Sequence, residues 1–313
     1  MKKRIYGIIG IRSIMANWNA DFTGFPKTLS SGEVFGSDKA LKFPMKKMWD
    51  AMGEKVLYIK SWKVDESKKD EISTRPKSLR ERYDEIFETN LKEEKNKLGV
   101  IKNLFQAIDV KNFGATFAEE KNNIGITGAV QIGQGMNKYE DTFAEEQQIL
   151  SPFRDGSKDK EDGEANQSTL GTKIVSNEAH YFYPFTINSD TYEEFIKMGV
   201  TDGYTEEDYK KFKDAALTSA TYYNSNSKLG CDNEFAIFIE TKNEYYLPNL
   251  DQYVKFEKSE EGKNVIELCF DKLLNDCGEN ILSVEIYYND LNVLVKHNIK
   301  GAKEYNIFTR KEV

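Results

Sequence analysis

Three lysines at helical spacing form the pattern in this chain that most directly suggests a binding chemistry. Lys39, Lys42 and Lys46 are three and four positions apart, so a helix would place their ammonium groups on one face. Ser37 precedes them and, with the open amides at the start of that helix, could hold an anion. Such a row could follow successive phosphates of a nucleic acid. A solvated lysine face is the alternative that the spacing leaves open.

Several other chemistries are disfavoured by the residues present. The chain has three cysteines and two histidines, at Cys231, Cys269, Cys277, His180 and His297. Their number and spacing fit neither a zinc site nor a disulfide framework, and we expect the cysteines to act as small buried hydrophobic residues. The Walker sequence GxxxxGK followed by Ser or Thr does not occur, which disfavours a nucleoside triphosphate site of that type. We therefore expect no metal and no cofactor.

Charge divides the chain into a basic start and an acidic remainder. Overall, 44 basic residues stand against 52 acidic ones, which gives −8. The first 63 residues hold 12 basic and 5 acidic residues, or +7, so the other 250 hold 32 basic and 47 acidic residues, or −15. This polarity is expected of a protein that holds a polyanion on one face. Uneven surface charge without a function is the alternative.

The length and composition are those of a folded protein with more than a minimal domain. The 313 residues exceed the usual single-domain size of roughly 100 to 200 residues, and hydrophobic residues make up 39%. No apolar run approaches the roughly 18 residues that span a bilayer, so we expect a cytoplasmic protein.

The elements that would position the lysines begin with a short apolar run. Residues 4–11 (RIYGIIGI) predict a buried strand, and a long polar loop is expected over 12–36. A helix should follow from a cap at Ser37 and Asp38 and close at Gly53, although Pro44 within it predicts a kink. Residues 55–63 (KVLYIKSWK) predict a second strand.

The rest of the chain alternates strands and helices with polar insertions. Residues 64–99 are charge-rich and predict a helical insertion, whereas residues 151–169 hold almost no apolar residue and predict the exposed tip of a long hairpin. Helices are expected over about 190–224, with a capping box at Thr205–Asp208, and a strand over 234–241. This order predicts an α+β fold of ferredoxin-like type.

Five segments together resemble a known family: RIYGIIGI, NWNADFTGFPKT, GSDKALKFPMKKMWD, IDVKNFGATF and ITGAVQIGQGMNKYE. They resemble the backbone subunit of CRISPR Cascade effectors in the RAMP superfamily, most closely the type I-B branch. The resemblance runs from about residue 4 to 187 and more loosely to about 240. It implies a ferredoxin-like, RNA-recognition-motif-like (RRM-like) palm over 1–63, 100–150 and 170–313. It also implies a helical finger over 64–99 and a β-hairpin thumb with its tip at 151–169.

The same resemblance implies a non-catalytic, RNA-binding function in antiviral defence. Such subunits polymerise along the spacer of the CRISPR RNA (crRNA) and present its bases to target DNA. The implied partners are the crRNA, target DNA through the guide, and further copies of the chain. They also include the large, small and repeat-handle-binding Cascade subunits and a recruited helicase-nuclease, with no membrane.

Candidate RNA contacts follow from the residue types in the resembling segments. Because the guide varies, we expect contacts to phosphates that leave the base edges open. For each loop residue an ordinary connection is the alternative, as is a tight turn for the glycines around Met136, which could otherwise wedge against a base. The predicted contacts are Arg12, Asn17, Asn19, Lys27, Ser37, Lys39, Lys42, Lys46, Gln134, Met136, Lys138 and Lys173.

Two rival functions remain from the sequence. Backbone subunits of the related type III effectors cut target RNA with an aspartate in the loop after the first strand, and Asp21 lies in the equivalent stretch NADFTG. This chain would then be a metal-dependent endoribonuclease. The other rival is an assembly module with an acidic surface that binds no RNA.

Overall fold

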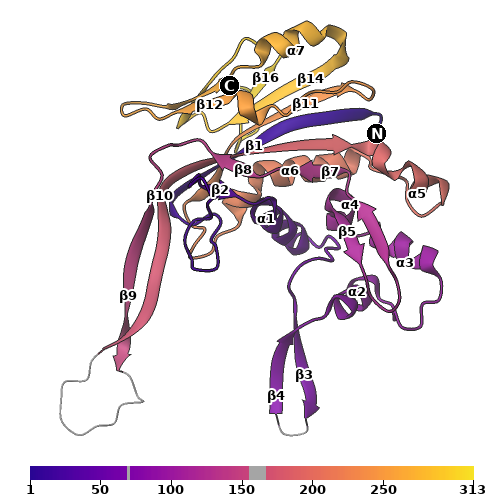
Figure 1. The fold of residues 1–313 in the computed structure, drawn as a ribbon. Coiled ribbons are helices and arrows are strands. Elements are labelled where there is room, and N and C mark those ends of the chain that lie inside the picture. Colours follow the sequence, from indigo (N-terminus) through magenta and orange to yellow (C-terminus); the bar gives the residue numbers. More distant parts are fainter. Residues whose placement is uncertain (69–70, 155–166) are drawn as a thin grey trace, which may run out of the picture.

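The chain folds around one large, mainly antiparallel sheet that has helices on one face and a smaller sheet on the other (Figure 1). This computed structural model describes residues 1–68, 71–154 and 167–313. The strand order of the main sheet is β16-β14-β11-β1-β10-β8-β2, and β7 and β9 also pair with β10. Its strands are β1 (Lys3–Ala16), β2 (Phe35–Gly36), β7 (Val130–Ile132), β8 (Gly135–Asn137), β9 (Ala144–Arg154), β10 (Gln167–Asn188), β11 (Cys231–Lys242), β14 (Ile281–Tyr288) and β16 (Lys303–Asn306).

Strand β1 lies at the centre of the main sheet because its apolar side chains fill both faces. It pairs with β10 on one side and with β11 on the other. Ile5 and Ile9 belong to the core beneath the helices, and Tyr6 and Ile8 to the core on the opposite face, as the period of two requires. The predicted buried strand is confirmed, but it runs on to Ala16. The predicted loop over 12–36 is therefore wrong in its first five residues.

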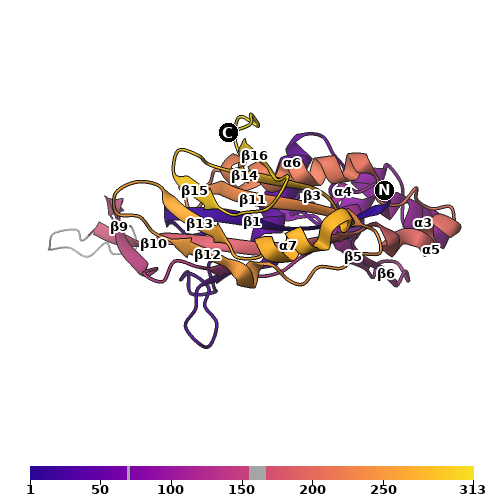
Figure 2. The same ribbon diagram turned by 90° about the horizontal axis from the view of Figure 1, so that it is seen from above.

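Two separate layers cover the main sheet. Helices α1 (Asp38–Ala51), α4 (Ile108–Phe113) and α6 (Glu206–Tyr222) cover one face. Figure 2 shows the other layer crossing over β1, β10 and β11. It consists of the three-stranded sheet β12-β13-β15 and helix α7. Their bounds are β12 (Val254–Glu257), β13 (Asn264–Leu268), β15 (Val293–Lys296) and α7 (Asp271–Cys277).

Helix α1 forms as predicted around an apolar stripe. Ser37 caps it by accepting a 3.3 Å hydrogen bond from the amide of Ala40, and Gly53 follows its end with a φ of +84°. Leu41, Met45 and Trp49 are buried, whereas Met52 at the end of the helix is exposed. Pro44 lies inside the helix and is buried, so packing keeps the helix continuous through a residue that removes one backbone donor.

The strand predicted over 55–63 is wrong, because its amides find another partner. Val56 and Leu57 are buried, as a strand would require. However, the amides of Leu57 and Tyr58 each donate a 2.8 Å hydrogen bond to the carboxylate of Asp109, one to each oxygen. The segment bends at residues 57–59 and forms no ladder with a neighbouring strand, and a new strand begins only at Trp62.

The helical insertion predicted over 64–99 is also wrong in its first part. A hairpin of β3 (Trp62–Lys68) and β4 (Glu71–Pro76) comes first, and Pro76 is compatible with the end of a strand but not with a helix interior. Arg75 bonds Asp65 in the facing strand at 3.1 Å and Glu81 at 2.7 Å. Helix α2 (Leu79–Phe87) starts at a capping box formed by Ser78 and Glu81, and α3 (Lys97–Leu104) follows.

The long hairpin β9–β10 projects from the same side of the body as β3–β4 (Figure 1). Its strands reach Arg154 and resume at Gln167. The predicted tip over 151–169 is therefore too long at both ends, and its middle, residues 155–166, lies outside the described residues. Strand β10 belongs both to the main sheet and to this hairpin.

The remaining elements complete the layers. The predicted capping box of Thr205 and Asp208 starts α6, and the strand predicted over 234–241 is β11. None of the helices in the described ranges is long and apolar enough to cross a bilayer. The other elements are β5 (Gly114–Phe117), β6 (Ile124–Thr127), α5 (Glu193–Lys197) and the short helices η1 (Ser189–Tyr192), η2 (Asp251–Tyr253) and η3 (Gly278–Asn280).

Candidate nucleic-acid interface

The loop between β1 and α1 is tied to the start of α1. The side-chain oxygen of Asn19 accepts a 2.7 Å hydrogen bond from the amide of Ser37. Ser37 in turn uses its hydroxyl to cap the helix, so two predicted contact residues form one rigid junction. Lys27 lies in the same loop, and its ammonium group is 5.6 Å from the ring centroid of Phe35.

The same loop is tied to the base of the β9–β10 hairpin. Asn17 is buried, and its amide nitrogen donates to the carbonyl oxygens of Gly24 at 2.8 Å and Ile174 at 3.3 Å. Lys173, on the same strand, reaches the side-chain oxygen of Asn226 at 3.5 Å. The structure thus joins Asn19 to Ser37, places Lys173 next to Ile174 on the hairpin, and gives Asn17 a role inside the protein.

Arg12 stands apart from this junction. It lies within β1 rather than in the loop, and its guanidinium pairs with Asp232 of β11 at 3.1 Å. Lys228, at the end of the loop after α6, donates to the backbone carbonyls of Asn17 and Trp18, and burial lowers its pKa. Arg12, part of the basic surplus near the start of the chain, is therefore neutralised within the protein.

The lysine row of α1 is graded in exposure. Lys39 is exposed, whereas Lys42 pairs with Asp38 at 2.8 Å and Lys46 donates to the carbonyl of Tyr58 at 2.9 Å. Burial lowers the pKa of Lys46 and outweighs the opposite effect of Asp109. A uniformly solvated lysine face is therefore wrong. Lys42 and Lys46 line a cavity of about 350 Å³, together with Tyr58, Asp109, Phe113, Gly114, Ala115, Thr116 and Ile126.

The segment around Met136 packs against the protein's own aromatic residues. Met136 lies in β8 opposite Phe35 of β2 and Phe182 of β10. A Cβ atom on Gly135 would lie 2.4 Å from the ring of Tyr183, so this glycine allows the close approach of a core ring. Close packing against Tyr183, and not the tight turn given as the alternative, explains Gly135, while Gln134 between β7 and β8 is exposed.

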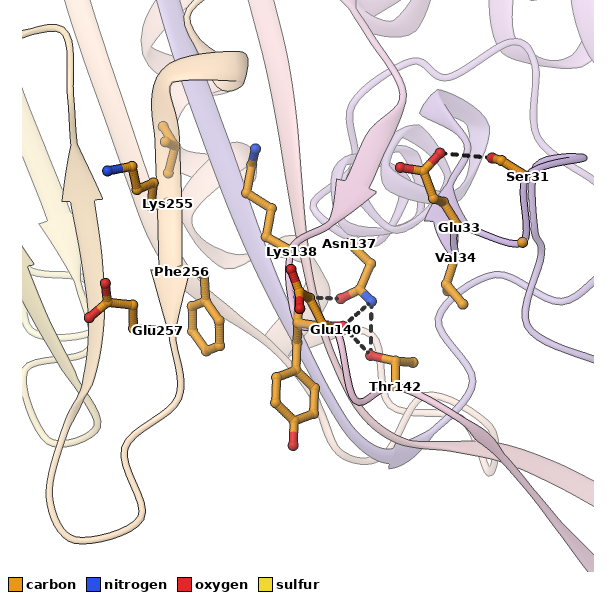
Figure 3. Close-up of a pocket in the computed structure, with 13 residues that line it drawn as sticks. Ser31, Glu33, Val34, Asn137, Lys138, Glu140, Thr142, Lys255, Phe256 and Glu257 are labelled. Atoms are coloured by element: carbon orange, nitrogen blue, oxygen red, sulfur yellow. Dashed lines mark hydrogen bonds between the residues drawn. The ribbon is translucent and has the colours of Figure 1, made fainter.

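Lys138 lines a second and larger cavity of about 800 Å³ (Figure 3). In the figure Lys138 and Glu140 stand between Phe256 of β12 and Glu33 of the β1–α1 loop. Burial lowers the pKa of Lys138, and Asp251 opposes this effect. Carboxylates outnumber ammonium groups around this cavity, since Glu33, Glu140 and Glu257 face Lys138 and Lys255. Its charge is less suited to phosphate than the junction at Ser37.

Asp21, the alternative catalytic residue, caps a turn. Its Oδ1 accepts hydrogen bonds from the amide and hydroxyl of Thr23, at 2.8 and 2.7 Å, and from the amide of Phe25 at 3.1 Å. The hydrogen bond from the Thr23 hydroxyl is the main cause that lowers the pKa of Asp21. Among the described residues, no cluster of three metal-binding side chains includes Asp21.

Two features of this region were missed by the sequence reasoning. Phe22, beside Asp21, is fully exposed on the turn that Asp21 caps. Asp109 is buried beneath the lysine row, and an acidic residue inside the otherwise apolar stretch AIDV was the available signal for it. No comparable signal marked Phe22, because an aromatic residue in a polar loop is usually expected to fold inward.

A large mixed sheet, helices on one face and two projecting hairpins define the class of this protein, an α/β chain built around one main sheet. The family model for CRISPR-associated protein Cas7 matches residues 3–272. The chain belongs to the Cas7 family. A search of curated proteins finds no match.

One solved structure shows a similar fold at low sequence identity. A chain of a CRISPR RNA-guided surveillance complex, pre-nicking, is similar with a TM-score of 0.57 and 12% identity over 97% of this chain and 96% of that one. A chain of a CRISPR RNA-guided surveillance complex has a TM-score of 0.49 and 13% identity, over 95% of this chain and 94% of that one.

Proposed function

We propose that this Cas7-family chain is a crRNA-binding backbone subunit of a type I CRISPR effector complex. The family match over residues 3–272 is the observation that carries the proposal. The junction at Asn19 and Ser37 supports it, because a helix start with an exposed lysine nearby suits a phosphate whatever base it bears. The type I-B branch is the subtype that the sequence resembles.

The finer architecture belongs to the same proposal. The main sheet with its helices would be the RRM-like palm, residues 62–104 the finger and the β9–β10 hairpin the thumb. Copies of the chain would line up along the guide and leave its bases free to pair with target DNA. The large, small and repeat-handle-binding subunits and the helicase-nuclease would complete the complex.

Of the predicted contacts, the structure favours those at the junction and near the hairpin. Asn19, Lys27, Ser37, Lys39, Gln134 and Lys173 stay candidate RNA contacts. Lys42 would need to leave Asp38 in order to bind a phosphate. Arg12, Asn17, Lys46, Met136 and Lys138 already contact the protein or lie against the acidic cavity, so we rank them below the others.

The test is purification of the chain co-expressed with its crRNA. We expect the protein to carry nuclease-sensitive material that absorbs at 260 nm and to elute as an assembly much larger than 36.0 kDa. Nuclease treatment should return it to smaller species. A chain that purifies free of RNA under these conditions contradicts the proposal and favours the assembly module without RNA.

We propose that the subunit itself is not catalytic. Incubating the assembly with complementary RNA and Mg²⁺ tests the ribonuclease alternative. Both Asp21→Asn and Asp21→Ala would abolish cleavage if the carboxylate bound a metal. Regularly spaced products that disappear in both variants would overturn the non-catalytic proposal.

A further inference from the structure

Phe22 is held away from the protein at the tip of the β1–α1 loop. Its side chain is fully exposed, more so than any other large hydrophobic side chain in the described ranges. Folding would normally bury such a ring, since burial of a phenylalanine is among the larger hydrophobic gains available to one residue. A single exposed apolar residue needs no explanation by itself, so the question is whether the surrounding structure holds it there.

The turn that carries Phe22 is braced from within. Asp21 accepts three hydrogen bonds on Oδ1, two from Thr23 and one from Phe25. Its amide also donates to the carbonyl of Phe25 at 2.8 Å, and an isolated bridge joins Ala20 to Pro26. These bonds fix the backbone on both sides of Phe22.

The turn is also bound, through Asn17, to the β9–β10 hairpin. The buried amide of Asn17 binds the carbonyls of Gly24 and Ile174 together. Gly24 has a φ of +92°, which disfavours other residues, and an added Cβ there would lie 3.5 Å from the side chain of Ile174. The tip therefore rests on the base of the β9–β10 hairpin. Asn17, a predicted RNA contact, acts here as a positioning residue.

The position of the tip identifies the kind of partner. Asn19 ties the loop to Ser37 at the start of α1, and Lys173 lies beside Ile174 on the hairpin. The turn that carries the ring is thus tied both to the start of α1 and to the hairpin, the two places where the proposed function puts RNA contacts. The immediate neighbours of the ring are Asp21 and Thr23, which are polar and offer no apolar rim for a protein interface. An exposed aromatic ring next to the proposed RNA backbone can stack on a nucleobase. Such stacking does not depend on the identity of the base.

We propose that Phe22 stacks on a nucleobase of the bound guide strand, and that Asp21 and Asn17 position it. This inference rests on the proposed function and adds the base contact. Such a contact is compatible with a variable guide because every base presents a π face. It also gives Asp21 a structural role in place of the catalytic one.

The experiment compares two ligands of the purified full chain: a short oligouridylate and a ribose–phosphate oligomer of the same length without bases. Binding of each is measured for the wild type, Phe22→Ala, Phe22→Leu and Phe22→Tyr. Phe308→Ala is the matched control, since Phe308 is an exposed phenylalanine just after β16, at the opposite edge of the main sheet from β2.

We expect Phe22→Ala to weaken oligouridylate binding about tenfold and to leave binding of the base-free oligomer unchanged. Phe22→Leu should behave like Phe22→Ala, because leucine keeps the apolar bulk without the ring, and Phe22→Tyr should behave like the wild type. Equal losses on both ligands would overturn the inference. Normal oligouridylate binding by Phe22→Ala would also overturn the inference. This holds even if Phe22→Ala impairs the self-association of the protein.

Asp21 gives an independent readout of the positioning. Asp21→Ala removes the acceptor that braces the turn, so it should lose part of the base-dependent affinity, whereas Asp21→Asn keeps an acceptor oxygen and should restore it. If wild-type protein binds neither oligomer, the proposed function fails and this inference falls with it. If wild-type protein binds both oligomers equally, only the stacking inference fails.

Discussion

The imidazole of His180 lies inside the protein with its Nδ1 atom 2.7 Å from Oε1 of Glu234. Its other nitrogen is 2.9 Å from Glu178, and the ring of Phe256 stacks on it at 4.0 Å between centroids. Lys258 also pairs with Glu178. Residues of β10, β11 and the β12 region therefore meet at one buried histidine, which joins the small sheet to the main sheet.

This arrangement predicts a loss of stability at high pH. Burial alone would lower the pKa of His180, but Glu234 and Glu178 raise it overall above 6.5. Below pH 6.5 the histidine is charged in both the folded and the unfolded state, and its contribution to the free energy of unfolding is fully present. As pH rises, the unfolded state loses its proton first, so the contribution declines until pH passes the folded-state pKa.

Thermal unfolding from about pH 5.5 to about pH 8.5 measures this effect. The decline above pH 6.5 should be smaller in His180→Gln than in the wild type. His297→Gln is the control, because His297 bonds a single carboxylate, Glu304, at 3.1 Å. Identical pH slopes for wild type and His180→Gln would contradict the prediction.

Asp109→Ala should destabilise the protein by about 2–3 kcal/mol. The substitution leaves the amides of Leu57 and Tyr58 without the acceptor that now satisfies them. Denaturant unfolding measures the change, with Asp202→Ala, at an exposed aspartate, as the control. A stability loss no larger than that of the control would mean that the hydrogen bonds from Leu57 and Tyr58 to Asp109 do not stabilise the fold.

Gly135→Ala should destabilise the fold by about 1–3 kcal/mol through overpacking. The new Cβ would lie 2.4 Å from the ring of Tyr183. Gly125→Ala is a matched control in β6, since a Cβ there meets nothing within 4 Å. Equal midpoints for the two variants in a denaturant titration would show that Tyr183 can move aside.

Lys39→Gln should weaken RNA binding and reduce its salt dependence. For a single strand, the slope of log affinity against log salt becomes shallower by about 0.7 for each phosphate that is no longer neutralised. Lys300→Gln, which removes an exposed charge in the C-terminal region, should leave both quantities unchanged. The two variants are compared in parallel salt titrations. Equal slopes would contradict the assignment of Lys39 as a phosphate contact.

Local signals predicted the elements whose own residues carry a clear pattern, even where their partners lie far away in the sequence. Ser37, the apolar stripe and Gly53 were enough for α1, and the apolar run was enough for β1. The segment after α1 was mistaken for a strand because the group that binds its amides, Asp109, lies about fifty positions further on. Charge alone suggested a helix where β3 and β4 form, although Pro76 opposed one.

The candidate site was predicted in outline but not in its side-chain partners. Residue type and spacing identified the lysine row, yet they could not reveal that Tyr58 accepts a hydrogen bond from Lys46 or that Asp232 pairs with Arg12. Such partners depend on strand register and loop path. The role of Asn17 likewise depends on Ile174, which only the folded chain brings close.

Strand β10 passes without a break from the ladder with β1 into the projecting hairpin, and the register shifts within it lie near the hairpin end, between Gln167 and Gly171. The β9–β10 hairpin is therefore a direct extension of a strand in the middle of the main sheet. A pull along it would load the many cross-strand bonds to β1 in parallel, as shear, so they would have to break together. The hairpin is thus mechanically continuous with a strand that pairs directly with β1, in the middle of the main sheet.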